Sequence, residues 1–311
     1  MNTAYSRFAV EIDTINEKAT EDPKKMVARG EEAYANQVEQ IVDGILEQGS
    51  RIILVAGPSS AGKTTSAYKI KEGLIKRGKV AFVMSMDDFF FDDDKVPFNE
   101  LGERDIENLC ALDVECVKSC LADILANKKT MFPQFDFIAH ARKEEWIPCD
   151  LGEEGILVME GIHALNPVFT EGFEDPSKIY RVYVHCNTNF CYNDVPHLPA
   201  RMLRLIRRII RDERDRGVPV IETIERWNAI CKGEDKNIRP FKGLANYRLN
   251  SSHFYEPGLY KEEMLENLKD AKKNGLANEI CERLQPFVVV KEKLVPKNSL
   301  VREFIGLKEK K

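Results

Sequence analysis

Apolar and polar residues follow two alternating periodicities along most of the chain. Short apolar runs of strand length stand at residues 51–56, 80–84, 156–159, 180–184, 247–250 and 287–291. Between them, segments such as 63–76 and 114–126 repeat apolar residues at helical spacing. Strands that alternate with helices in this way build a parallel sheet with helices on both of its faces. The pattern therefore predicts an α/β fold.

The two ends of this pattern differ from its middle. Residues 1–50 are mostly polar, and helical spacing emerges only late, at Ala33, Val38, Ile41, Ile45 and Leu46, before Gly49. We expect a mobile start and one amphipathic helix in residues 1–50, packed on a domain formed by residues 51–311. Residues 131–150 are rich in aromatic residues and proline and fit no helix, which predicts a β-hairpin excursion from the sheet edge.

A glycine-bounded loop, GPSSAGKTT, follows the first apolar run directly. Gly57 is followed after four residues by Gly62, Lys63 and Thr64, which is the spacing of a phosphate-binding loop between a strand and a helix. Glycines let several N–H groups converge on phosphate oxygens at the positive end of the next helix. A simple glycine turn between two core elements is the alternative. The residues expected to bind a nucleotide are Gly57, Pro58, Ser59, Ser60, Ala61, Gly62, Lys63, Thr64 and Thr65.

Composition narrows the setting. With 311 residues, 43% of them hydrophobic and 31% charged, the chain is long enough for a full α/β core. The net charge of −5 argues against general affinity for nucleic acids. Among eight cysteines no pair has zinc-knuckle spacing, so we expect Cys116 and Cys120 to be core thiols. No apolar run has membrane-spanning length and the N-terminus lacks a signal-like core, which predicts a cytoplasmic protein.

Acidic residues follow two of the predicted strands, where ligands of parallel sheets bind. Asp87 comes directly after the run at 80–84, where its carboxylate could accept a proton from an attacking hydroxyl and lie near Mg²⁺. Residues 92–94 are also aspartates, and we interpret them as a solvated acidic loop. Glu160 ends the run at 156–159 and is the candidate for binding Mg²⁺, directly or through water. We expect Lys63 to reach the β and γ phosphates and the Thr64 hydroxyl to hold Mg²⁺.

The segment 201–217 predicts a helix with a stripe of arginines. Arg201, Arg204, Arg208 and Arg211 share one face, and Met202, Leu205, Ile206 and Ile209 occupy the opposite one. A guanidinium group binds phosphate oxygens bidentately and can follow negative charge as it migrates during phosphoryl transfer. The stripe therefore suits a lid over a polyphosphate. The alternative is a solvated face with internal ion pairs, because acids such as Asp212 are interleaved.

Taken in order, these stretches resemble the uridine kinase and phosphoribulokinase family of P-loop kinases. The matching segments are GPSSAGKTT, MDDFF, ALD, FPQFDFIAHAR, MEGIHALNP, RRIIRDERDRG and NSSHFYE, and with the C-terminal segment below the resemblance covers about residues 50 to 306. The C-terminal PKNSLVREFIG further resembles longer bacterial uridine kinase-like proteins. The resemblance implies a P-loop NTPase fold and transfer of the γ-phosphoryl group of ATP to the 5′-hydroxyl of a nucleoside.

The resemblance also implies individual roles. It makes Asp87 the general base and assigns Thr64, Glu160 and Asp87 to the Mg²⁺ site. Phosphates would be contacted by Lys63, Arg208, Arg211 and Arg216, and the acceptor by Asp87, Arg208, Glu107, Phe135, His140 and Arg226. Phe135 stands where uridine kinases typically have tyrosine, and Glu107, Val218 and Arg226 also depart from their pattern. A lost hydrogen bond to a polar substrate costs about 1–3 kcal/mol, so the nucleoside-reading residues carry over less well than the phosphate-handling ones.

The sequence therefore predicts a kinase dependent on ATP and Mg²⁺ that acts on a small hydroxylated metabolite, most closely a pyrimidine nucleoside. Alternatives are a sister kinase for a sugar phosphate or pantothenate, with Arg226 as an extra basic group, and a nucleotide-binding regulatory module without transfer. We expect a small-molecule partner, no nucleic acid and no membrane, and leave a homo-oligomer open.

Overall fold

Five parallel strands form the central sheet of the computed structural model, which describes residues 8–98, 102, 104, 108–271 and 273–306. Their order across the sheet is β12, β9, β2, β8, β3. The bounds are β2 (Ile52–Ala56), β3 (Ala81–Ser85), β8 (Ile156–Glu160), β9 (Ile179–His185) and β12 (Tyr247–Asn250). All residues of β2 and β8 are buried, as expected for inner parallel strands covered on both faces. Five of the six predicted strands are thus confirmed.

The sixth predicted strand, residues 287–291, is wrong. The backbone N–H of Val290 donates to the carbonyl of Gly258 at 3.0 Å, and Lys261 Nζ donates to the carbonyl of Phe287 at 2.9 Å. Both partners belong to the helix α7 (Glu256–Asn267). Phe287 and Val290 are buried in the helical part of the core. The run is apolar because it packs against helices, and its peptide groups bond to a helix instead of a strand.

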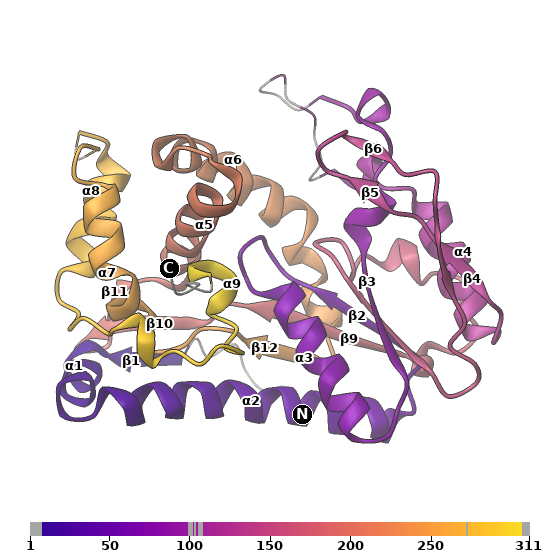
Figure 1. Cartoon of the computed structure of the whole chain (residues 1–311), viewed down its shortest axis with the longest axis horizontal. Coiled ribbons are helices and arrows are strands. Elements are labelled where there is room, and N and C mark those ends of the chain that lie inside the picture. The colour runs from indigo at the N-terminus through magenta and orange to yellow at the C-terminus, as the bar shows by residue number, and fades with distance from the viewer. Residues whose placement is uncertain (1–7, 99–101, 103, 105–107, 272, 307–311) are drawn as a thin grey trace.

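Helices cover both faces of the central sheet (Figure 1). On one face α2 (Pro23–Gln48) and α3 (Lys63–Lys76) pack apolar side chains against β2, β8 and β9. On the other face lies α4 (Val114–Leu125), whose first turn is capped by Asp113. The predicted α/β P-loop NTPase fold with helices on both faces is therefore confirmed.

Two small antiparallel ladders leave the β3 side of the sheet beside α4 (Figure 1). β4 (Thr130–Phe132) pairs with β7 (Ile147–Cys149), and β5 (Phe135–Asp136) pairs with β6 (Ala141–Arg142). Arg142 fixes the excursion, because its guanidinium donates to the carbonyls of Phe89 and Phe90 and to the Asp113 carboxylate. This confirms the predicted hairpin excursion.

The N-terminal region is more ordered than we expected. β1 (Phe8–Glu11) pairs in parallel with β10 (Thr188–Tyr192), and β10 pairs with β11 (Val195–Leu198) in a second, three-stranded sheet. α1 (Ile12–Glu21) and α2 follow, with Pro23 in the first turn of α2 and Gly49 at its end with a φ of 67°. The predicted amphipathic helix is confirmed, whereas the mobile start is wrong from Phe8 onward; residues 1–7 lie outside the described residues. The domain division at residue 50 stays a prediction.

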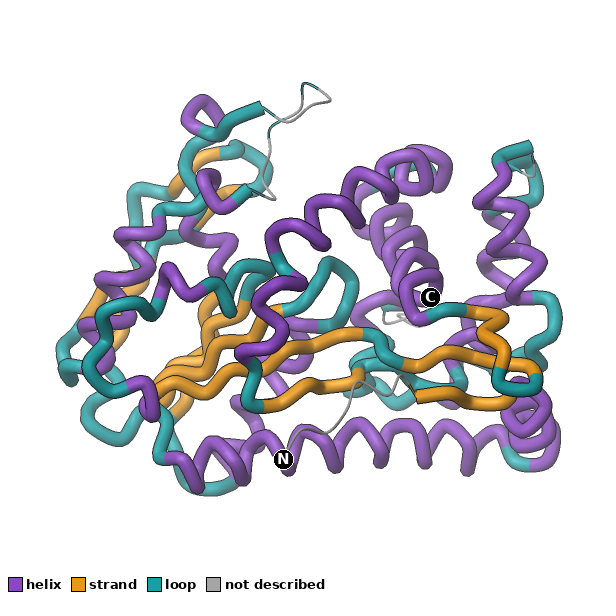
Figure 2. The backbone as a smooth tube through the Cα atoms, turned by 180° about the vertical axis from the view of Figure 1, so that it is seen from behind, coloured by secondary structure: helices purple, strands orange, loops and turns teal. Residues whose placement is uncertain are grey.

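A second helical layer stands above the small sheet, and α2 runs beneath both sheets in both views (Figures 1 and 2). It contains α5 (Ala200–Arg216), α6 (Val220–Asn237), α7 and α8 (Gly275–Leu284), and the short α9 (Arg302–Ile305) packs against α5. These helices share one apolar cluster with α1 and β10. In the described part of the chain no helix is long and apolar enough to cross a membrane.

Candidate active site

The loop after β2 has the geometry of a phosphate cradle. A Cβ atom on Gly57 would lie 2.0 Å from the carbonyl oxygen of Val184, so only glycine fits between β2 and β9. Ser60 and Gly62 adopt positive φ angles of 58° and 85°, which turn the backbone sharply into α3. The first N–H groups of α3 have no helical partner and face the end of the loop. The local geometry fits the predicted phosphate-binding loop.

Residues at the tips of β8 and β3 meet the first turn of α3. Thr64 Oγ1 donates a hydrogen bond to Glu160 Oε1 at 2.9 Å, and Ser85 Oγ lies 3.4 Å from the same oxygen. The Ser85 hydroxyl also accepts the backbone N–H of Asp87 at 3.2 Å, which fixes the turn after β3. Ser85 was not singled out in the sequence, since a serine at a strand end carries no distinctive signal. Thr64, Glu160 and Asp87 therefore belong to one site.

Burial and mutual charge dominate the electrostatics of this site. Desolvation raises the pKa of Glu160 to about 7, with the Lys63 ammonium acting against it and the Asp87 carboxylate adding to it. Desolvation also raises the pKa of Asp87, while Lys63 and Arg216 favour its ionised form. Lys63 thus lies within electrostatic reach of both carboxylates. Lys63, Asp87 and Glu160, at the ends of three different elements, therefore form one cluster of interacting charges.

Asp88, next to Asp87, has a structural role that sequence reasoning missed. Its Oδ1 accepts the backbone N–H of Phe135 at 3.1 Å and so ties the hairpin excursion to the tip of β3. The Phe135 ring is buried and contacts Phe90 and Phe137 edge-on, with centroids 5.9 Å and 5.1 Å away. An Asp-Asp pair at a strand end indicates an active site but not which of the two faces it. Here Asp87 faces Lys63 and Asp88 faces the hairpin.

The other predicted acceptor residues lie farther out or outside the described residues. His140 is exposed, and its Nδ1 lies 3.3 Å from an oxygen of Asp93. Arg226 lies on α6 and forms an ion pair with Glu222 at 2.9 Å. Glu107 is outside the described residues. Among these predicted residues, the structure ties only Phe135 to the β3 tip through a contact it describes.

The arginines of α5 do not form the single stripe that we expected. Arg204 is buried and pairs with the Glu234 carboxylate, and Arg201 pairs with Asp235 at 2.6 Å. Arg207, which the expected stripe did not include, is fully buried and forms a bidentate pair with Glu256. Placing Arg204 over a polyphosphate is therefore wrong, because buried carboxylates from α6 and α7 hold these guanidinium groups inside the helical layer.

Three arginines of α5 do gather near the loop, around one aspartate. Asp212 is buried, and its carboxylate forms ion pairs with Arg208 at 3.0 Å, Arg211 at 2.7 Å and Arg216 at 3.4 Å. Arg208 also donates to Ser59 Oγ of the phosphate loop at 3.0 Å. The internal ion pairs that we weighed as an alternative are thus present, together with a direct contact to the loop. Asp212 could have been found from its spacing of four residues from both Arg208 and Arg216.

The residues present fit a nucleotide with Mg²⁺. The buried hydroxyl of Ser60 finds no hydrogen-bond partner among the described residues, inside a loop that turns its backbone donors to one point. The Thr64 hydroxyl and the Glu160 carboxylate offer the hard oxygen ligands that Mg²⁺ prefers, and it usually takes only one or two from a protein. Donors for phosphate and ligands for its metal therefore lie side by side.

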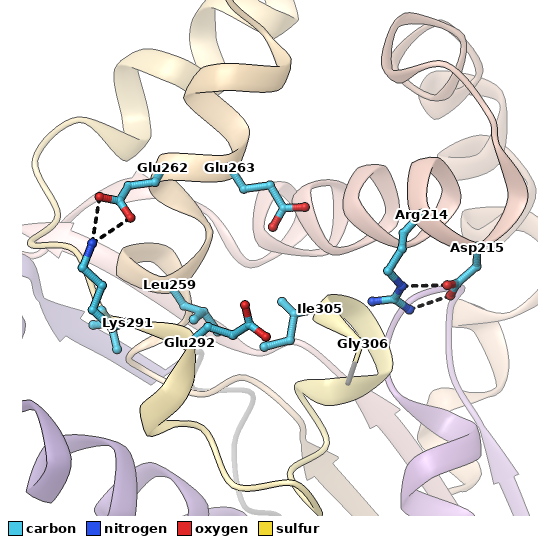
Figure 3. Close-up of a pocket in the computed structure, with 10 residues that line it drawn as sticks. Arg214, Asp215, Leu259, Glu262, Glu263, Lys291, Glu292, Ile305 and Gly306 are labelled. Carbon is cyan, nitrogen blue, oxygen red and sulfur yellow. Dashed lines mark hydrogen bonds and ion pairs between the residues drawn. The ribbon is translucent and has the colours of Figure 1, made fainter. Parts of the chain in front are cut away.

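A separate cavity of about 800 Å³ lies between α9, α7 and the end of α5 (Figure 3). It is lined by residues from the end of α5, from α7 and from the C-terminal segment, and contains none of the predicted site residues. Arg214 pairs with Asp215 on one wall, and Lys291 with Glu262 on the other. This cavity is not the candidate active site.

Fold and site together define a P-loop protein of the phosphotransferase kind. Residues 52–251 match the model of the Phosphoribulokinase / Uridine kinase family, and the chain belongs to this family. Uridine kinases of Staphylococcus aureus strains JH9 and Newman are 25% identical to it over 200 residues, which cover 64% of this chain and 86% of each relative. The chain is a small-molecule kinase of the P-loop class.

Solved structures of similar proteins include a possible uridine kinase from Bacillus stearothermophilus, with 17% identity and a TM-score of 0.44 over 69% of this chain and 97% of that one. A D-glycerate 3-kinase from Cryptococcus neoformans has 15% identity and a TM-score of 0.35 over 86% of this chain and 87% of its own.

Proposed function

We propose that this chain transfers the γ-phosphoryl group of ATP to the 5′-hydroxyl of a pyrimidine nucleoside, with Mg²⁺ as cofactor. The observation that carries the proposal is the charge cluster of Lys63, Asp87 and Glu160 at the phosphate loop, where the Thr64 hydroxyl donates to Glu160 at 2.9 Å. Family membership supports a small-molecule kinase, and the 25% identical uridine kinases support a nucleoside as the acceptor.

Asp87 acts as the general base in this proposal. In the transfer, the acceptor oxygen forms a bond to the γ-phosphorus, the bond from that phosphorus to the β,γ-bridging oxygen breaks, and ADP leaves. The hydroxyl proton goes to the Asp87 carboxylate. Its raised pKa brings the carboxylate closer to the strength that a base needs near neutral pH, while Lys63 keeps its ionised form accessible.

The remaining residues position charge. Lys63 and the N-terminal N–H groups of α3 bind the β and γ phosphates, and the guanidinium groups of Arg208 and Arg211 stabilise the charge that develops during transfer. Thr64 and Glu160 would hold Mg²⁺, which would neutralise phosphate charge. To bind phosphates, Arg208, Arg211 and Arg216 must break their ion pairs with Asp212 and form new ones with phosphate oxygens.

The hairpin excursion forms the acceptor side of the site. Phe135, with Phe90 and Phe137, offers an aromatic surface against which a base can pack, and Asp88 fixes its distance from the β3 tip. The missing tyrosine hydroxyl at Phe135 leaves one hydrogen bond to the base unmade. We therefore expect this protein to discriminate less between pyrimidine nucleosides than it would with a tyrosine at this position.

A coupled ADP-release screen tests the proposal. Nucleosides, ribulose 5-phosphate and pantothenate are offered with ATP, with and without Mg²⁺, and phosphorylated products are identified by mass. We expect Mg²⁺-dependent transfer to uridine or cytidine. Transfer only to ribulose 5-phosphate or pantothenate would replace the nucleoside as acceptor, and ATP binding without any transfer would leave a regulatory module.

A further inference from the structure

The C-terminal segment 299–306 reaches the phosphate loop although it lies outside the residues that match the family model, 52–251. Leu300 is buried against the loop, and a Cβ atom on Gly62 would lie 2.7 Å from its Cδ1. Glu303 on α9 is half-buried, and its Oε2 accepts a hydrogen bond from Thr65 Oγ1 at 2.5 Å. A carboxylate from this segment therefore stands at the first turn of α3.

The same segment is held from its other side by α5. Arg214 Nη2 donates to the carbonyl of Glu303 at 3.2 Å, and Arg214 Nη1 donates to the carbonyl of Phe304. The Phe304 ring packs against the buried guanidinium of Arg207, with the centroid 4.6 Å from its Cζ. Two hydrogen bonds from Arg214 and the packing of Phe304 on Arg207 thus hold α9 against α5.

This contact conflicts with the chemistry of phosphate binding. The Thr65 hydroxyl has a single proton, and while it is donated to Glu303 it cannot be donated to a phosphate. The Glu303 charge reaches into the site, because it adds to the factors that favour the protonated form of Glu160. A fixed negative charge beside the positive end of a helix also offsets the field that attracts an anion there.

We propose that Glu303 belongs to the nucleotide site and sets its affinity, by holding Thr65 and by opposing the phosphate charge until the two side chains separate. The proposal rests on the proposed function, since it takes the ligand of the loop to be a nucleoside triphosphate. It assigns a role in nucleotide binding to a segment that the family match does not include.

The surroundings of α9 leave space for this separation. Ile305 and Gly306 line the cavity of about 800 Å³ that lies between α9 and α7 (Figure 3). A shift of α9 into this space would move Glu303 away from Thr65. Because Arg214 binds the same short helix, the shift also bears on the end of α5, which carries Arg211 and Arg216.

Calorimetric titration of the full chain with ATP and with ADP, both in Mg²⁺, measures the effect. Glu303→Gln removes the charge and keeps an acceptor oxygen, and we expect its dissociation constant for ATP to fall about three- to tenfold at low salt. The gain shrinks as salt is added and is smaller for ADP, which carries less charge. Glu303→Ala, which frees the Thr65 hydroxyl, binds ATP at least as tightly as Glu303→Gln.

Two controls separate this inference from the proposed function. Glu262→Gln removes the same charge from an exposed acid that pairs with Lys291, and it leaves ATP binding unchanged. Lys63→Ala weakens ATP binding; if it does not, the nucleotide site itself is wrong. If Lys63→Ala weakens binding while both Glu303 variants bind ATP like the wild type or more weakly, the inference about Glu303 is wrong and the proposed function stands. If the Glu303 variants bind ATP more weakly than the wild type but bind 2′-deoxy-ATP equally well, Glu303 is a ribose ligand, and the inference is wrong in this case too.

Discussion

Replacing Glu160 with glutamine should stabilise the protein at alkaline pH while removing a ligand of the Mg²⁺ site. Glu160 is 5% exposed, and desolvation raises its pKa from 4.5 to about 7. Between these pH values the folded protein keeps a proton that the unfolded chain has lost, so the free energy of unfolding falls as the pH rises through this window. The glutamine side chain of the Glu160→Gln variant has no such proton to lose and can still accept the Thr64 hydroxyl.

The size of the effect follows from the difference between the two pKa values. The variant should be more stable than the wild type by about 1 kcal/mol at pH 5 and about 3 kcal/mol at pH 8, above which the difference levels off. Urea unfolding in EDTA, without nucleotide, measures both free energies at each pH. Phosphoryl transfer by the same variant should be strongly reduced at every pH.

The matched control is Glu154→Gln, which alters an exposed acid in the loop that leads into β8, where Lys79 lowers the pKa. It should show no gain in stability at pH 8. A stability difference for Glu160→Gln that does not change between pH 5 and pH 8 would show that Glu160 does not keep its proton in the folded protein. A variant that is less stable than the wild type at pH 8 would show the same.

Three further substitutions test other parts of the structure. Glu256→Gln leaves the fully buried Arg207 without its counter-charge and should lower the free energy of unfolding by about 3–5 kcal/mol in urea, whereas a loss under 1 kcal/mol would mean that the pair is not buried as described. Gly57→Ala places a Cβ atom 2.0 Å from the Val184 carbonyl and should cost about 2–3 kcal/mol, read as a lower melting temperature together with weaker ATP binding. Phe135→Tyr should raise kcat/KM for uridine about tenfold relative to a nucleoside with a different base edge, and equal changes for both would exclude Phe135 from base recognition.

Local sequence patterns were enough for the central sheet and the phosphate loop. Runs such as those that became β2 and β8 are apolar throughout because both of their faces are buried, so each is visible without its neighbours. The loop after β2 is equally local, since its glycines are required by close contacts such as that of Gly57 with Val184. The acids at the strand tips followed from the rule that ligands bind at the carboxyl ends of parallel strands.

Contacts between residues that lie far apart along the chain could not be predicted from the sequence. β1 is only four residues long, and it forms a strand because it pairs with β10 about 180 residues later. Arg207 looks like a surface residue of an arginine-rich helix until Glu256 is folded against it. The Glu303 contact with Thr65 spans 238 residues. The prediction of a strand at 287–291 was wrong for a different reason. Apolar character alone does not distinguish a segment that packs against helices from one that pairs in a sheet.

If Lys63, Asp87 and Glu160 act together on one triphosphate and its acceptor, the substitution Asp87→Asn should abolish most of the turnover while ATP still binds. The variant is assayed beside Asp94→Asn, which alters an exposed acid of the following loop, for ATP affinity by calorimetry and for turnover by ADP release with the preferred nucleoside. We expect Asp87→Asn to bind ATP within about twofold of the wild type while kcat falls by about 10²- to 10⁴-fold, and Asp94→Asn to change neither. Turnover by Asp87→Asn at the wild-type rate would mean that Asp87 is not the general base.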